Sequence, residues 1–384
     1  VEGSSIELDN AVVAVRIDAE GHVSSMVHHE TGREVVAPGS VANVLQTFED
    51  LPTHFDAWEI EDYTLRRPRE QREVDSIEVL ETGPLVARVE VRRSFGSSKV
   101  VQRYVLRAGS PRLDIECEVD WRERETLLKV AFPIDVHSTS LTREVQLGEC
   151  STPIHTNTSW DAARFEVCAL RWVDCSEPGF GVALLNDSKH GHDATRIVAD
   201  GGDRPAVQLR LSLLRSSRYP DTEQDQGAHR FTYSLMPHDG DRHGAGVAAQ
   251  AWLLNNTIRE FGGEGGDPGQ AEADPFVANG VTIASSSSCA VVIEAVKAAD
   301  DGSGDIVVRC HESTGARGPV ELRVGFAASA VQMVDGRERC ASVSRHVRSV
   351  ESSLRWESNQ IATSVTFSIR PFEIVTLRLR PRPT

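Results

Sequence analysis

The stretch Leu113–Trp121, LDIECEVDW, decides the fold class of this chain. Apolar residues occupy every second position from Leu113 to Trp121, and acidic residues stand between them. Successive side chains of a β-strand point to opposite faces, so this alternation predicts a strand with one buried and one solvated face. Such strands are typical of antiparallel sheets.

Similar alternation recurs at residues 207–213, 231–235 and 365–369, with turn-forming clusters of Gly, Pro, Asp and Ser between the runs. Helical periodicity is nearly absent, and its best candidate, Val247–Asn256, fits either a short helix or a strand. The absence of a glycine-rich phosphate loop argues against a nucleotide-binding domain. The sequence therefore predicts an all-β chain of mostly antiparallel strands.

A shift in composition divides the chain. Residues 261–275 are rich in Gly and acidic residues, which cannot bury apolar surface, and they predict a linker or a long loop. Residues 276–384 carry further strand patterns and have the size of a small β-sandwich. Residues 1–260 then form a larger β-domain, with two extended sheets packed face to face.

Charge and composition limit the partners. A net charge of −16 and a pI near 5.3 argue against nucleic acid and anionic membrane surfaces as partners. No apolar run has the length of a membrane span. The seven cysteines are an odd number without a Cys-x-x-Cys motif, which predicts reduced thiols in a cytoplasm. Because the chain starts with Val1 and not with Met, we expect it to be truncated at its start.

The stretch His155–Val167, HTNTSWDAARFEV, mixes aromatic, acidic, amide and hydroxyl side chains in a way that suits a sugar or a structured loop. Trp160 stands beside Asp161, and Trp58 stands near Asp56. An aromatic face can stack on a sugar ring while a carboxylate accepts hydrogen bonds from its hydroxyls. The alternative is a buried Trp with a capping Asp, and Asp161 in particular could cap a short helical turn.

Other catalytic patterns are weak. His190-Gly191-His192-Asp193 has ligand-like spacing but makes only a partial zinc site, and we interpret it as an exposed loop. No Gly-x-Ser-x-Gly motif supports a serine nucleophile. Glycoside hydrolysis needs two carboxyl groups across the scissile bond, and sequence separation does not show which of the many carboxylates converge.

Several segments occur in the same order as in the C-terminal β-region of glycoside hydrolase family 38 α-mannosidases, which nearly the whole chain resembles. The segments are residues 43–50 with 55–59, 155–168, 181–187, 209–216, 225–233 and 371–378. The resemblance implies a galactose-mutarotase-like supersandwich followed by a smaller β-sandwich domain.

The resemblance also implies a function. The enzymes of this family are retaining, zinc-dependent exo-glycosidases that hydrolyse terminal α-mannosides, and their nucleophile, acid/base and zinc ligands belong to an N-terminal part that this chain does not resemble. We therefore expect no catalytic residue and no metal ligand here, zinc only in the full-length enzyme, and no activity of this chain alone. The expected partners are its own N-terminal catalytic domain and α-mannoside oligosaccharides.

The β-domain is expected to close the active-site pocket and to fix the orientation of the sugar. The residues expected to face the sugar are Asp56, Trp58, His155, Asn157, Trp160, Asp161 and Arg215. Arg215 is included because it stands just after a predicted strand, where a guanidinium can reach a hydroxyl or a carboxylate. All seven have the alternative role of holding the β-domain together.

Two other functions stay open. A self-standing carbohydrate-binding module would use accessible Trp58 and Trp160, and a mutarotase-like aldose epimerase would need an acid and a base, such as His155 and His229 with a Glu partner. Whether the chain forms a homo-oligomer also stays open.

Overall fold

The structure is a computed structural model that describes residues 5–199, 204–256, 280–286, 289–339 and 353–383. It divides into two compact units, of which unit 1 comprises residues 1–145 and 150–257, and unit 2 comprises residues 146–149 and 258–384. The predicted linker 261–275 lies outside the described residues.

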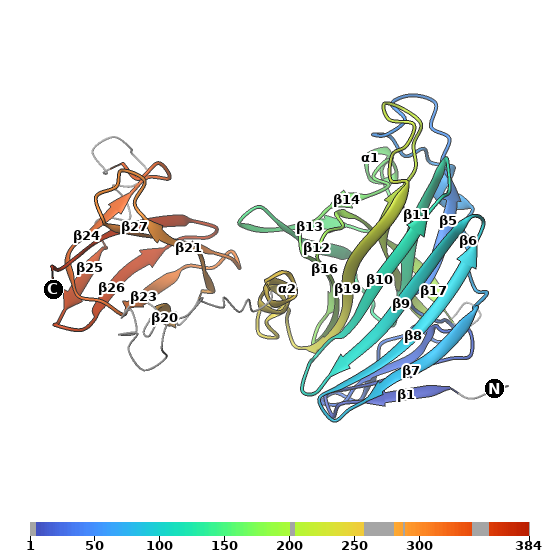
Figure 1. The fold of residues 1–384 in the computed structure, drawn as a ribbon, viewed down its shortest axis with the longest axis horizontal. Helices are drawn as coiled ribbons and strands as arrows, with labels where there is room; N and C mark the ends of the chain where they lie inside the picture. Colours follow the sequence, from blue (N-terminus) through green and yellow to red (C-terminus); the bar gives the residue numbers. More distant parts are fainter. Residues whose placement is uncertain (1–4, 200–203, 257–279, 287–288, 340–352, 384) are drawn as a thin grey trace, which may run out of the picture. The chain divides into compact units, whose positions relative to one another are not determined.

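In unit 1, the residues that the structure describes form three antiparallel sheets (Figure 1). The four-stranded sheet has the order β1 (Ile6–Asp9), β2 (Val13–Ile17), β3 (Val23–His28), β4 (Arg33–Glu34). The nine-stranded sheet has the order β13 (Gly148–Pro153), β12 (Ser140–Val145), β15 (Trp172–Glu177), β16 (Phe180–Asn186), β19 (Gly227–Asp239), β10 (Leu113–Trp121), β9 (Ser98–Arg107), β8 (Val86–Phe95), β7 (Ser76–Thr82). The six-stranded sheet has the order β14 (Val167–Cys168), β17 (Gly191–Ala199), β18 (Arg204–Arg215), β11 (Thr126–Ile134), β5 (Val44–Glu49), β6 (Arg69–Glu70).

Strand β10 covers the stretch that predicted the fold class, and it lies inside the nine-stranded sheet between β9 and β19. Its apolar residues are buried, as the alternation predicts. Asp114 is buried as well, which corrects the expectation of a fully solvated acidic face. The side chains of Arg112 and Ser234 hydrogen-bond to it at 2.8 and 2.6 Å, and Arg107 also pairs with it. Paired carboxylates are tolerated inside a protein.

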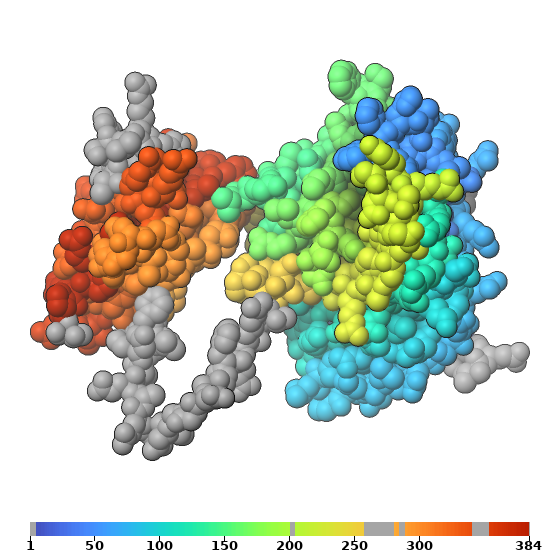
Figure 2. Space-filling view, turned by 45° about the horizontal axis from the view of Figure 1, so that its top comes forward, coloured from blue at the N-terminus to red at the C-terminus, as the bar shows by residue number. Residues whose placement is uncertain are grey.

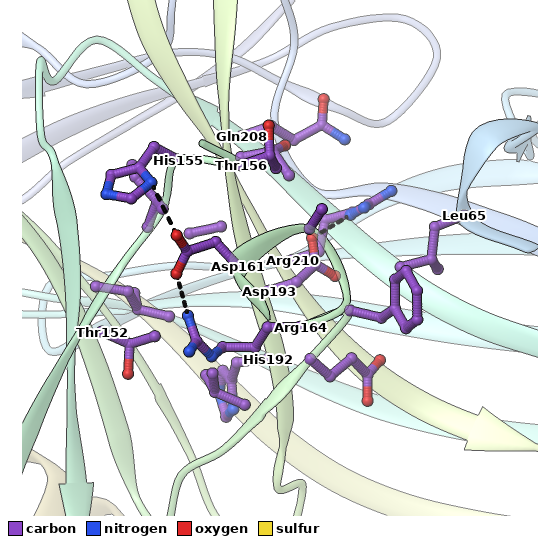
Figure 3. A pocket seen from close by; sticks show the side chains of 18 of the residues that line it. Leu65, Thr152, His155, Thr156, Asp161, Arg164, His192, Asp193, Gln208 and Arg210 are labelled. Atoms are coloured by element: carbon purple, nitrogen blue, oxygen red, sulfur yellow. Dashed lines mark hydrogen bonds and ion pairs between the residues drawn. The ribbon is translucent and has the colours of Figure 1, made fainter. Parts of the chain in front are cut away.

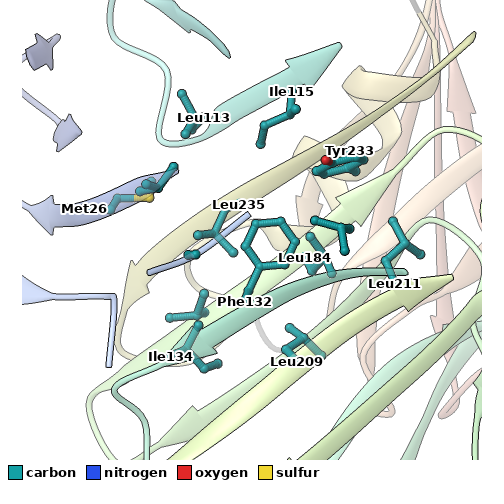
Figure 4. Close-up of a cluster of buried hydrophobic side chains, with 14 of the residues drawn as sticks. Met26, Leu113, Ile115, Phe132, Ile134, Leu184, Leu209, Leu211, Tyr233 and Leu235 are labelled. Atoms are coloured by element: carbon teal, nitrogen blue, oxygen red, sulfur yellow. The ribbon is translucent and has the colours of Figure 1, made fainter. Parts of the chain in front are cut away.

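The main hydrophobic core lies between the nine-stranded and six-stranded sheets and continues to the four-stranded sheet (Figure 4). Phe132 of β11 meets Tyr233 of β19 edge-on, with 6.0 Å between the ring centroids. Leu211 of β18 and Met26 of β3 belong to the same cluster. One core therefore joins strands that are far apart in the sequence, as in a sandwich of packed sheets.

Helices are few in the described residues. They are the 3₁₀ turn η1 (Thr64–Arg66), α1 (Ser159–Ala162) and α2 (Val247–Asn255). Of the two interpretations left open for residues 247–256, the helix is correct, and Val247 and Ala251 of α2 are buried in a small cluster with Trp172 and Met236. None of the helices described here is long and apolar enough to cross a membrane.

The described residues of unit 2 form two four-stranded antiparallel sheets. One has the order β20 (Val281–Ser286), β23 (Gly318–Val324), β26 (Thr363–Ile369), β25 (Arg355–Ser358), and the other β21 (Val291–Ala298), β22 (Ile306–Glu312), β27 (Ile374–Pro381), β24 (Ala328–Val334). Residues such as Val308, Leu322, Phe367 and Leu377 form a core shared by both sheets. The predicted all-β fold, with a large and a smaller β-sandwich, is confirmed. The six cysteines of the described residues are free thiols, and Cys340 lies outside them.

Candidate functional site

Two surface segments of unit 1 carry the residues that were expected to face a sugar. Segment 50–68 follows β5, and segment 154–167 follows β13 and contains α1. Residues of both segments line one cavity. Figures 1 and 2 show them at the same end of unit 1, coloured blue and green, together with the yellow loop that follows β18.

Arg215, the last residue of β18, forms an ion pair with the buried Asp50 at the end of β5. Arg215 Nε lies 2.5 Å from Asp50 Oδ2, and Nη2 lies 3.0 Å from Oδ1. The guanidinium also donates to the backbone oxygens of Ala57 and Glu59. Burial raises the pKa of Asp50, and the hydrogen bonds from Arg215 oppose that shift. The structure thus places Arg215 as an anchor for the segment that begins at Asp50.

Asp56 and Trp58 lie on the anchored segment. Asp56 Oδ2 accepts hydrogen bonds from the backbone N–H groups of Arg218 and Tyr219, at 2.6 and 2.9 Å. Trp58 is 66% exposed and meets the ring of Tyr219 edge-on, with 6.5 Å between the centroids. Phe55 is exposed beside them in sequence. The loop after β18 is therefore tied to segment 50–68, and the alternative of a buried tryptophan is wrong for Trp58.

Segment 154–167 brings His155, Asp161 and Arg164 together (Figure 3). His155 Nδ1 lies 3.5 Å from Asp161 Oδ2, and Arg164 Nη1 lies 3.3 Å from Asp161 Oδ1. The Thr158 hydroxyl donates to Asp161 Oδ2 at 2.7 Å and accepts the Asp161 backbone N–H at 3.1 Å. The Thr158 hydroxyl is the main cause of the lowered pKa of Asp161, with smaller effects of His155 and Arg164. Thr158, and not Asp161, caps α1.

The seven predicted residues thus form two groups. Asp56, Trp58 and Arg215 belong to the first, and His155, Asn157, Trp160 and Asp161 belong to the second. Within the second group His155 and Asp161 line the cavity, whereas Asn157 and Trp160 do not. Trp160 is 85% exposed, so the buried-tryptophan alternative is wrong here too.

The cavity between the two segments has a volume of about 450 Å³. Its apolar lining includes Leu65, Leu141, Ile154, Phe165, Val167 and Ala194. Its polar lining includes His155, Asp161, Arg164, Glu166, His192, Asp193, Gln208 and Arg210, most of them labelled in Figure 3. This combination of apolar surface and a few convergent polar groups is typical of small-molecule sites.

Paired charges on the six-stranded sheet form the inner wall of the cavity. Lys129 of β11 is fully buried, lies 2.7 Å from Asp193 Oδ2 and also pairs with Glu166. Arg210 Nε donates to Asp193 Oδ1 at 2.8 Å. Buried charges are tolerated because they are paired. Sequence reasoning missed this network, although a single lysine within the apolar run of β11 was a signal for it.

Gly191 makes room for Glu166 to reach this network. A Cβ at residue 191 would come within 2.6 Å of Glu166 Oε2. The Ser212 hydroxyl also hydrogen-bonds to Glu166, from the neighbouring strand β18. The glycine between the two histidines of the suspected metal motif therefore serves the packing of a carboxylate.

The histidines of that motif do not converge. His190 Nδ1 lies 3.0 Å from the backbone oxygen of Ala169. His192 is fully buried in β17, so the exposed-loop interpretation is wrong for it, and its Nδ1 lies 3.2 Å from the backbone oxygen of His190. Burial lowers the pKa of His192 to about 4. Within the described ranges, no group of three or more His, Cys, Asp or Glu is arranged to hold a metal, so these residues do not fit a zinc ion.

The two histidines of the epimerase alternative have different partners. His229 Nε2 lies 2.8 Å from the backbone oxygen of Asp225, whereas His155 lies beside Asp161. In the part of the chain that the structure describes, no hydrogen bond or ion pair joins the two histidines.

Comparisons with known proteins identify the family of this chain. The model of the glycosyl hydrolases family 38 C-terminal domain matches residues 8–223, and that of the family 38 C-terminal beta sandwich domain matches residues 290–377. Human Alpha-mannosidase 2C1 is 35% identical over 99% of this chain, which covers 34% of that protein. Alpha-mannosidase G of Dictyostelium discoideum is 32% identical over 97% of the chain, which covers 32% of that protein.

Among solved structures, an alpha-mannosidase from Enterococcus faecalis V583 shares the fold over 98% of this chain and 43% of its own, with a TM-score of 0.70 and 16% identity. The chain spans about a third of the length of the curated relatives it matches. From the two family matches and the 35% identity, we conclude that the chain belongs to glycosyl hydrolase family 38 and corresponds to the C-terminal domains of its α-mannosidases.

Proposed function

We propose that this chain is the C-terminal β portion of an α-mannosidase, in which the end of unit 1 that bears segment 50–68 lies against an N-terminal catalytic domain and closes the mannoside site. The observation that carries the proposal is the match of nearly the whole chain to about a third of Alpha-mannosidase 2C1. Hydrolysis of terminal α-mannosides is a property of the whole protein in this proposal.

The geometry of segment 50–68 supports the proposed role. Trp58, Phe55 and Tyr219 expose aromatic surface on one anchored pair of loops. Exposed aromatic groups on a rigid loop suit either a protein interface or the face of a sugar ring. The Arg215–Asp50 pair holds the loop in place, because it ties the start of the segment to the end of a core strand. Positioning of a sugar by rigid residues contributes to catalysis without chemistry of its own.

The chemistry itself is assigned to the N-terminal domain. The family resemblance implies that zinc there would bind mannose hydroxyls, beside a nucleophilic and an acid/base carboxylate. The residues of this chain would exclude water from the site, orient the α-mannoside and keep the aromatic loops in place.

The proposal is tested by grafting this chain onto the N-terminal part of human Alpha-mannosidase 2C1 in place of the matching region. We expect the chimera to release p-nitrophenol from p-nitrophenyl α-mannoside and the 384-residue chain alone to release none. Turnover by the chain alone would overturn the proposal, and so would an inactive chimera whose circular dichroism and unfolding transition show intact folding.

A point substitution sharpens the test. Trp58→Ala in the chimera is expected to lower kcat/KM about tenfold, since the exposed ring would no longer support the sugar site. Trp356→Ala is the matched control, because Trp356 is an exposed tryptophan on β25 of unit 2. Equal losses for both variants would argue against a special role of the aromatic loops.

A further inference from the structure

The cavity under segment 154–167 is electrically balanced. Each carboxylate in its lining has a cationic partner. The pairs are Asp62 with Arg66, Asp161 with Arg164, Asp193 with Arg210, and Glu166 with Lys129. A lining without an unpaired charge offers little to a phosphate or a polyamine, which need an excess of the opposite charge. A neutral ligand fits this wall best.

His192 is the most buried polar side chain of the lining. Its ring is fully buried, and its Nε2 atom is inaccessible from the cavity and has no hydrogen-bond partner among the described residues. Burial lowers the pKa of His192 to about 4, so the ring is neutral at pH 7 and adds no charge to the cavity wall.

Arg210 supplies hydrogen-bond donors to the lining. It is 6% exposed, and its Nε is used by Asp193. Its terminal amino groups make no hydrogen bond within the described parts of the chain, and the guanidinium lies 5.4 Å from the ring centroid of Phe48. A hydroxyl group can accept from these donors without bringing a charge, so a neutral ligand with hydroxyls matches Arg210.

The apolar side of the cavity completes the match. Leu65, Ile154 and Phe165 lie in the same lining as the polar groups. The C–H face of a sugar ring packs on such side chains while its hydroxyls make hydrogen bonds. The volume of about 450 Å³ is enough for a single ring with water beside it.

We propose that this cavity of unit 1 binds a neutral, polyhydroxylated molecule the size of one sugar ring, with a hydroxyl accepting a hydrogen bond from the terminal amino groups of Arg210. The site is built from unit 1 alone. Its test therefore needs no hydrolysis, and its outcome is independent of the proposed mannosidase role.

The test is calorimetric titration of the 384-residue chain with methyl α-mannoside, methyl α-glucoside and the linear polyol mannitol. Saturable binding of at least one pyranoside is expected, with a Kd on the order of 1 mM, as befits a ligand of this size. Mannitol distinguishes a ring site from a general polyol site, and inorganic phosphate is expected not to bind. Absence of saturable heat up to about 50 mM for all three polyols would overturn the proposal.

Two neighbouring alanines give a matched pair of variants. Ala162 and Ala163 are both exposed, but only Ala162 lines the cavity. Ala162→Trp is expected to weaken binding at least about tenfold by filling the entrance, and Ala163→Trp is expected to leave it unchanged. Equal effects of the two variants would contradict the proposed location. Trp160 does not line the cavity, so a loss of binding in Trp160→Ala together with full binding in Ala162→Trp would contradict it as well.

Discussion

At the scale of single residues, the Arg215–Asp50 pair makes a clear prediction about stability. Asp50 is fully buried, so Arg215→Ala leaves a carboxylate without its partner inside the protein. We expect unit 1 to lose about 3–5 kcal/mol of unfolding free energy, measured by urea denaturation. Arg122→Ala is the control, because the Arg122–Asp120 pair is half exposed and should change stability by less than about 1 kcal/mol. A small effect of Arg215→Ala would mean that the anchor is dispensable.

A second residue, His22, predicts a response to acid. His22 is buried, and neither ring nitrogen has a hydrogen-bond partner among the described residues. Burial, then the charges of Arg93 and Arg72, lower its pKa to about 4, against weaker opposing effects of Glu20 and Glu70. The folded state therefore takes up its proton later than the unfolded state, whose histidine titrates near 6.5.

Stability should accordingly fall as the pH drops from 6.5 to 4, by up to about 3 kcal/mol from His22, and level off below the folded pKa. The measurement is the urea midpoint at pH 7 and at pH 4.5. His22→Leu is expected to remove this part of the loss, whereas substitution of the exposed His54 should not. An unchanged acid response in His22→Leu would refute the assignment.

Single residues also show where sequence reasoning ends. The exposure of Trp58 and Trp160 could not be predicted, because it depends on which loops fold over them. Trp58 is tied down through Asp56 by the backbone of Arg218 and Tyr219, more than 150 residues away in the chain. The chemistry of the side chains was enough to select these residues from the sequence. Their grouping into two clusters depends on the fold, so it could not be predicted.

At the scale of elements, the outer face of the six-stranded sheet carries the network of Lys129. Lys129→Met leaves Asp193 and Glu166 with one cation fewer, and we expect a loss of about 3–5 kcal/mol in urea unfolding. Adding Glu166→Gln should restore part of the loss, because the side chain that loses its cationic partner becomes neutral, while Asp193 keeps Arg210. Strictly additive effects of the two substitutions would show that Lys129 and Glu166 do not interact.

The helix α1 predicts a local effect. Thr158→Ala removes the hydroxyl that caps α1, at a cost of about 1 kcal/mol to the helix. No residue of α1 is buried, so the melting temperature of unit 1 should barely change while amide exchange within residues 155–165 speeds up. Ser159→Ala at the next position is the control. Similar exchange in both variants would argue against Thr158 as the cap.

Elements differ in how far they could be predicted. Strand β10 follows from its own alternation, since burial of one face is a local property of the pattern. The helix α2 could be located but not assigned, because Val247–Asn255 has apolar residues on more than one side. For the cap of α1 the sequence suggested Asp161 as one alternative, whereas Thr158, three residues before it, is the cap, and this is the spacing of a capping pair.

At the scale of the whole molecule, units 1 and 2 have separate hydrophobic cores. We predict two transitions in differential scanning calorimetry, one for each core. Leu211→Ala should lower the transition temperature of unit 1 alone, and Leu322→Ala that of unit 2 alone. Each substitution should cost its unit about 2–5 kcal/mol of unfolding free energy. A single transition that both substitutions shift equally would show that the units unfold as one.

The place of β19 in the nine-stranded sheet has a consequence for biosynthesis. This strand lies between β16 and β10, yet it is the last strand of the sheet along the chain. It begins after the first of the two family 38 matches, which ends at residue 223. Until residues 227–239 leave the ribosome, β16 and β10 present unpaired edges, which are open to pairing with other chains. Nascent chains that stall before this point therefore expose two strand edges that the finished sheet covers.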